Sequence, residues 1–191
     1  LSVGSVDTIG RTISFSSRGP AYDGRIKPEL VAYSMAGSSN SAALVSGTAI
    51  LLQQLYREKF GVLPDAAIIK ALLINGAKDA GPSGIDFITG YGNLDARASI
   101  KALDENRIIR GEVINQQQVN FSIEVPANAQ NLKATLVWTD LPATPNAPSA
   151  LVNDLDFSML TPEDAMILPW VLIASPQLSS LQAPAQRGTD H

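Results

Sequence analysis

A short run of small and hydroxyl-bearing residues leads directly into a long apolar segment. Residues 37–43 read Gly-Ser-Ser-Asn-Ser-Ala-Ala, and the apolar segment begins at Leu44. Glycine lets the backbone bend sharply, and the free amides at a helix start favour negative charge close to them. A serine delivered to the first turn of a long helix in this way is a candidate nucleophile.

Other motifs occur in order along the chain. They are Val-Gly-Ser-Val-Asp at 3–7, Phe-Ser-Ser-Arg-Gly-Pro at 15–20, Lys-Pro-Glu-Leu-Val-Ala at 27–32 and Gly-Tyr-Gly-Asn-Leu-Asp-Ala at 90–96. Together with residues 37–43, these motifs resemble the C-terminal part of the catalytic domain of subtilisin-like serine proteases (subtilases). Two later motifs, Leu-Val-Trp-Thr-Asp at 136–140 and Leu-Val-Asn-Asp-Leu-Asp at 151–156, resemble the β-sandwich that follows this domain in a branch of the family.

The resemblance implies a role for one serine and places its partners outside the chain. It puts the nucleophile at Ser39, with the Ser39 amide as an oxyanion donor, and implies peptide-bond hydrolysis through a Ser-His-Asp triad. The triad order in subtilisin is Asp, His, Ser, so a segment that begins late in the domain carries the serine alone. His191, the one histidine, is the final residue and is interpreted as incidental. We expect the chain by itself to hydrolyse no peptide.

The chain also departs from the family pattern near this serine. The family has Thr, Met, Ala and Pro where this chain has Ser38, Asn40, Ser41 and Ala43, and it has Val-Gly-Ala-Val where this chain has residues 3–6. Ser38 and Ser41 are interpreted as structural, because a serine at a helix start usually caps it. Residues 33–36 alone separate the preceding strand from Gly37, which indicates either a short loop or residues that the sequence lacks.

These departures keep a second function open. A degenerate, non-catalytic subtilase homologue that acts as a binding or scaffold module would carry the same motifs without the chemistry. A free-standing β-sandwich adhesion module is disfavoured, since it leaves more than half of the chain unexplained. Under the leading interpretation the partner is a polypeptide substrate, and the resemblance implies a secreted protein.

The composition bounds these possibilities. The chain has 191 residues, of which 45% are hydrophobic, so it can bury a core. A net charge of −4 gives no electrostatic support for nucleic-acid binding, and the absence of cysteine excludes disulfides and thiolate metal sites. No apolar run approaches about 18 residues, so no membrane span is expected. Both ends resemble cuts through a larger protein, and we expect a fragment.

The first half predicts an α/β fold with a parallel sheet. Short apolar runs at 1–6, 13–15 and 30–33 predict strands covered on both faces. Residues 40–59 predict a buried helix that Gly61 ends, and Pro64 and Asp65 open a second helix that ends at Gly76. A short turn and helix are expected over 93–103.

From residue 105 the pattern predicts an antiparallel β domain. Runs at 107–114, 119–125, 132–139 and 151–160 have strand length, and 119–125 alternates cleanly. We therefore divide the chain into a catalytic-domain part at 1–104 and a β-sandwich, jelly-roll-like part at 105–191.

Three carboxylates of this second part are candidate metal ligands. Asp140, Asp154 and Asp156 offer the hard oxygens that calcium prefers, and related β domains in the family often carry calcium. Aspartates in loops more often form turns. Calcium therefore remains the less favoured of two interpretations.

Overall fold

A computed structural model describes residues 1–147, 151–173 and 185–188, and a two-stranded parallel sheet lies at its centre. Strands β1 (Val3–Val6) and β2 (Leu30–Tyr33) pair in parallel, with Val3 opposite Leu30. The predicted parallel pairing is confirmed. The strand predicted at 13–15 does not form, because this segment turns back along the free edge of β1, where Ile13 N–H donates to the carbonyl of Ser5 at 3.1 Å.

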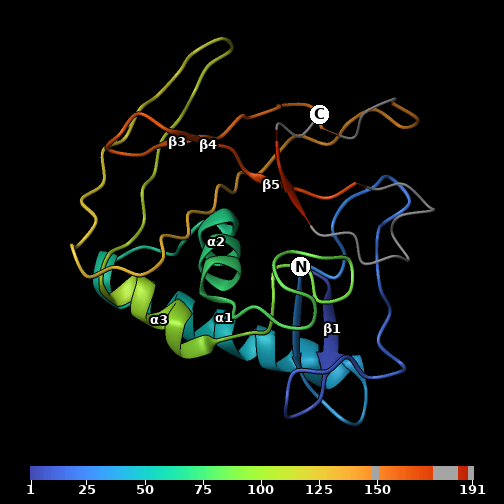
Figure 1. Cartoon of the computed structure of the whole chain (residues 1–191). Coiled ribbons are helices and arrows are strands. Elements are labelled where there is room, and N and C mark those ends of the chain that lie inside the picture. The colour runs from blue at the N-terminus through green and yellow to red at the C-terminus, as the bar shows by residue number, and fades with distance from the viewer. Residues whose placement is uncertain (148–150, 174–184, 189–191) are drawn as a thin grey trace.

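Helix α1 (Ser38–Phe60) crosses both strands and carries the candidate nucleophile at its start (Figure 1). It ends at Gly61, whose φ of 75° and bond to the Arg57 carbonyl form a left-handed cap. One stripe of the helix is buried, formed by Ser41, Val45, Thr48, Leu52 and Tyr56. The opposite face exposes 48% of Leu44, 62% of Ile50 and 52% of Leu51. The helix expected over 40–59 is present, but it is buried along one stripe only, because the described residues supply neighbours on one side.

Two shorter helices complete the core. Helix α2 (Ala66–Gly76) and helix α3 (Ala96–Asp104) pack against each other and against α1. Asp95 caps α3 by accepting from Ala98 N–H at 2.8 Å. Every buried hydrophobic side chain of the described residues lies between Val6 and Leu103.

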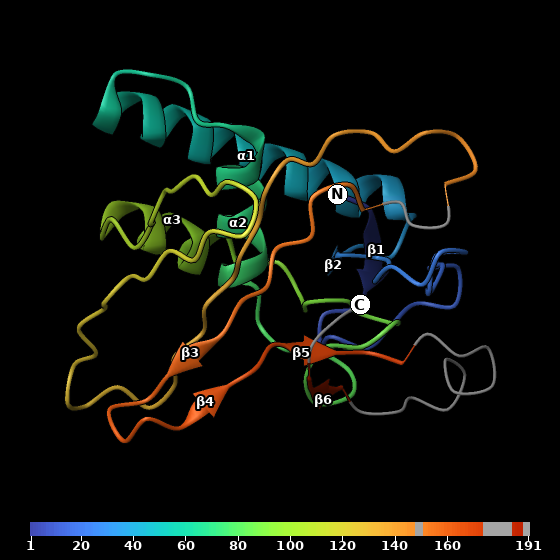
Figure 2. The ribbon, with the colours of Figure 1, turned by 90° about the horizontal axis from the view of Figure 1, so that it is seen from above.

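The described residues beyond Leu103 contain no buried side chain. The strands predicted at 107–114, 119–125 and 132–139 are absent, and part of this stretch forms a loop that projects away from the helices (Figures 1 and 2). The strands present form two short antiparallel pairs: β3 (Met159–Leu160) with β4 (Met166–Ile167), and β5 (Trp170–Val171) with β6 (Gln186–Arg187). A strand forms only where another strand and an apolar layer cover it. The β-sandwich and the boundary at 105 stay predictions.

Side-chain bonds around Lys133 connect this second part to the end of α2. The Lys133 ammonium donates to the carbonyls of Ile74 and Ala77 at 2.9 and 3.1 Å, at the C-terminal end of α2. The Asn75 side-chain amide donates to the carbonyl of Lys133 at 2.9 Å. These bonds satisfy carbonyls that a helix end leaves free. None of the helices in the described part of the chain combines the length and apolarity that a membrane span requires.

A buried carboxylate secures the start of β2. Glu29 is 6% exposed and accepts from the Ser2 amide at 2.6 Å, from the Ser2 hydroxyl at 2.7 Å and from the Lys27 ammonium. Burial alone raises a carboxyl pKa, but the bonds from Lys27 and Ser2 outweigh it and lower the pKa of Glu29 to about 2. The ionised carboxylate therefore holds the N-terminal residues against the sheet.

We expect this carboxylate to make stability depend on acid. The folded-state pKa of Glu29 lies below its ordinary value of 4.5, so its contribution is complete above pH 4.5 and is lost as pH falls towards 2. Glu29→Gln should lower the unfolding midpoint at pH 7 and flatten the decline of stability between pH 5 and 3, measured by circular dichroism. Glu112→Gln, at an exposed position, is the control. An unchanged acid profile in Glu29→Gln contradicts the assignment.

Candidate functional site

The connection from β2 to α1 is four residues long. Ser34 is buried, its amide donates to the Val6 carbonyl at 3.1 Å, and its hydroxyl accepts from Ala36 N–H at 3.1 Å. Gly37 then caps α1 with φ 143° and ψ 149°, a conformation that residues with a β-carbon rarely adopt. These four residues join β2 to α1 in the structure.

Ser39 is the second residue of α1 and is exposed. Among the described residues, none hydrogen-bonds to its hydroxyl, and the amides of Ser38 and Ser39 have no backbone acceptor; Asn40 N–H donates to the Gly37 carbonyl at 3.1 Å. The first turn contains no acidic side chain, so the positive end of the helix dipole is not neutralised there. The exposed Ser39 hydroxyl and two amides without backbone acceptors thus lie together at the start of this helix.

Ser41 points the other way and is completely buried. Its hydroxyl donates to the carbonyl of Ala32 in β2 at 2.8 Å and lies 2.9 Å from the hydroxyl of Ser5 in β1. The Ser5 amide in turn donates to the Ser16 hydroxyl at 2.9 Å. Ser41 therefore makes structural contacts, but with the two strands and not as the helix cap expected from the sequence, since α1 has no side-chain cap bond. Sequence analysis missed Ser5; the signal was that Ser5 and Ser41 both stand where the family motif has alanine.

The described residues supply no base for Ser39. They include no histidine, since His191 lies outside them, and no carboxylate bonds to the serine. A serine hydroxyl is a weak nucleophile until a base removes its proton. Ser39 therefore stays a candidate nucleophile whose base is not among the described residues.

The three predicted calcium ligands do not gather. Asp140 accepts from the amides of Leu141, Val152 and Asn153 and from the Asn153 side chain, at 2.7–3.0 Å. The Val152 bond is the largest cause of a lowered pKa of Asp140. Asp154 and Asp156 are exposed, and within the described ranges no three His, Cys, Asp or Glu form a group that could hold a metal. This arrangement does not support a calcium site, which stays a prediction.

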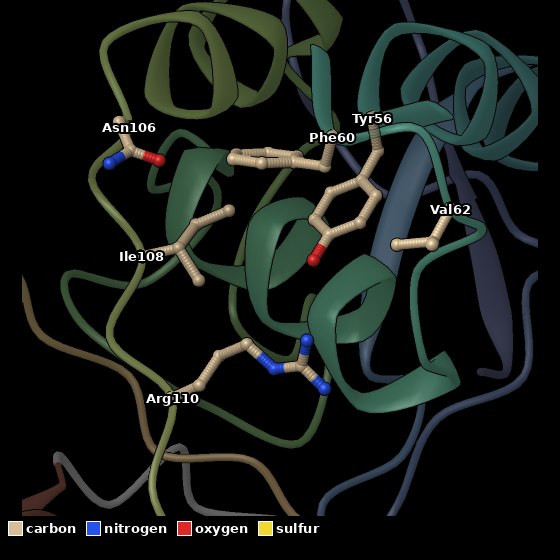
Figure 3. Close-up of a pocket in the computed structure, with 6 residues that line it drawn as sticks. All are labelled: Tyr56, Phe60, Val62, Asn106, Ile108 and Arg110. Atoms are coloured by element: carbon tan, nitrogen blue, oxygen red, sulfur yellow. The ribbon is translucent and has the colours of Figure 1, made fainter. Parts of the chain in front are cut away.

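An open hollow lies at the other end of α1 (Figure 3). Its volume is about 260 Å³, and its lining consists of Tyr56, Phe60, Val62, Asn106, Ile108 and Arg110. The Arg110 guanidinium already pairs with Asp65 at 2.5 Å. Phe60 follows Ser39 by 21 residues, which separates the two by roughly 30 Å along the helix. This hollow therefore takes no part in chemistry at Ser39.

The two glycines of this region should respond oppositely to the same substitution. A β-carbon at Gly37 or at Gly47 meets nothing within 4 Å, but Gly37 alone has a strained φ. We expect Gly37→Ala to destabilise the chain by about 1–3 kcal/mol and Gly47→Ala to stabilise it by about 0.5–1 kcal/mol. Thermal unfolding of both variants measures this. Equal effects of the two substitutions contradict the assigned cap geometry.

Comparison with known proteins gives consistent matches. The family model described as "Subtilase family" matches residues 1–92. The "Serine protease/ABC transporter B family protein tagA" of Dictyostelium discoideum is 29% identical over 200 residues, which cover 76% of this chain and 11% of the relative. The corresponding tagD protein of the same organism is 26% identical over 242 residues, which cover 81% and 13%.

Among solved structures, the crystal structure of a lanthipeptide protease is similar, with 22% sequence identity and a TM-score of 0.45. The match covers 53% of this chain and 40% of the lanthipeptide protease chain. This chain spans 11–13% of the length of the two relatives above. Both relatives carry the name serine protease.

Proposed function

We propose that this chain, which is a subtilase-like protein, supplies the nucleophile of a serine endopeptidase. The substrate class is polypeptide, as the protease family implies. The observation that carries the proposal is the position of Ser39: an exposed hydroxyl beside free amides at the start of α1, in the register that the family motif assigns to the nucleophile.

The chemistry follows from that position. The Ser39 oxygen attacks the peptide carbonyl and forms a bond to carbon while its proton passes to a base outside the described residues. The Ser39 amide and the positive end of α1 stabilise the oxyanion. The base then gives its proton to the leaving amine as the C–N bond breaks, and water later hydrolyses the acyl-enzyme.

The departures from the family motif are compatible with this chemistry. Asn40 and Ala43 are both exposed, so neither buries an unpaired polar group nor leaves a cavity. The helix begins at Ser38 without the proline that the motif usually places at position 43. The active enzyme is therefore preferred over the degenerate scaffold, whose main support was these substitutions.

Two parts of the proposal rest on the family resemblance. Residues 105–191 are proposed to join a β-sandwich once further strands cover their apolar positions, such as Phe121 and Ile123, which are 55% and 50% exposed. Secretion is proposed on the same resemblance.

Labelling with a fluorophosphonate tests the nucleophile, because this reagent reacts only with an activated serine. We expect the intact protein to be labelled, and Ser39→Ala to abolish labelling. Residues 1–191 alone should be neither labelled nor active on peptides, since no base for Ser39 lies among the described residues.

Ser38→Ala is the matched control, because Ser38 is the exposed serine next in the chain. It should retain labelling. Labelling that persists in Ser39→Ala, or that disappears equally in Ser38→Ala, overturns the assignment of Ser39.

A further inference from the structure

Two departures from the family motif contact each other inside the molecule. Ser5 and Ser41 are separated by 36 residues, and both stand where the family has alanine. Their hydroxyl oxygens lie 2.9 Å apart, and both residues are 0% exposed. The two substitutions therefore form one structural change.

The direction of the hydrogen bonds can be assigned. A serine hydroxyl has one proton to donate, and the Ser41 proton goes to the Ala32 carbonyl at 2.8 Å. The Ser5 hydroxyl must therefore donate to Ser41 Oγ. The result is a chain of bonds that runs from β1 through α1 to β2. Burial of either hydroxyl without its partner costs the full desolvation of that group.

We propose that Ser5 and Ser41 are positioning residues for Ser39. Ser41 lies two residues after Ser39 in the first turns of α1, and the glycine cap makes no side-chain bond that fixes the helix start. The bonds to Ala32 and Ser5 instead hold this turn against both strands. They set how far the Ser39 hydroxyl and amide project from the sheet. This inference rests on the proposed function of Ser39.

The two single substitutions should reduce stability and labelling to different extents. Ser41→Ala leaves the Ser5 hydroxyl without its partner and removes the side-chain bond to the Ala32 carbonyl, whereas Ser5→Ala leaves the bond from Ser41 to Ala32 intact. The double variant removes both hydroxyls and restores the alanine pair of the family motif. We therefore expect a double-mutant cycle in which the double variant loses less than the sum of the single losses.

The experiment measures fluorophosphonate labelling and unfolding of the intact protein. Labelling rates measured over a range of reagent concentrations give two quantities: the maximal rate constant and the reagent concentration at half of that rate. The temperature is kept below the unfolding midpoint of every variant. Ser41→Ala should lower the maximal rate constant by about tenfold or more, as misplaced reacting groups do, with little change in the half-maximal concentration. Ser5→Ala should lower it less.

Ser99→Ala is the matched control. Ser99 is a serine with 0% exposure in α3 whose hydroxyl donates to the Asp95 carbonyl at 3.0 Å. Its loss should lower the unfolding midpoint without changing the labelling rate constant. A role in stability alone predicts that Ser41→Ala behaves in the same way, and that result overturns the inference.

The two hypotheses fail differently. If the unsubstituted protein is labelled but the Ser5 and Ser41 variants label at its rate, the positioning role is wrong and the proposed function stands. If the unsubstituted protein is not labelled, the proposed function is wrong and the positioning role is wrong with it. Additive losses in the cycle contradict the coupling of the two serines.

Discussion

The bond from Ser41 to the Ala32 carbonyl is the contact on which the arrangement of α1 depends. It lies at the point where α1 crosses β1 and β2, and the Ser5 hydroxyl completes it from the neighbouring strand. Apolar contacts along Val45, Leu52 and Tyr56 bind the rest of the helix but specify its axial position weakly. A directional bond at the first turn fixes it, and thereby fixes the helix start where Ser39 lies.

Elsewhere, apolar side chains of the described residues are left exposed to solvent. The outward face of α1 exposes Leu44, Ile50 and Leu51, and the segment at 119–125 exposes its alternate apolar residues. In both segments the described residues cover one face or neither. The same cause explains two differences from expectation: α1 is buried along one stripe only, and no strands form at 107–114, 119–125 and 132–139. Sequence periodicity predicts which face is to be covered, but coverage requires a neighbour.

Local signals predicted the elements that position the site. The run at 30–33 predicted β2, and the glycine at 61 predicted the end of α1, because turn and cap chemistry act within a few residues. The motif register placed Ser39 at an exposed helix start. The contact between Ser5 and Ser41 spans 36 residues and follows from tertiary packing, so no local pattern contains it. The strand predicted at 13–15 does not form, because the chain turns there. Its backbone bond from Ile13 to the Ser5 carbonyl lies along the outer edge of β1.

The departures from the family motif fall into two physical classes. At exposed positions such as Asn40 and Ala43, water satisfies any polar group, so substitution there carries little information about function. At the buried positions, a serine at position 5 without Ser41 would leave its hydroxyl unpaired, at a cost of about 1–3 kcal/mol. Ser41 supplies the acceptor for Ser5 and itself donates to the Ala32 carbonyl. The two buried substitutions are therefore coupled to each other, whereas the exposed ones are not.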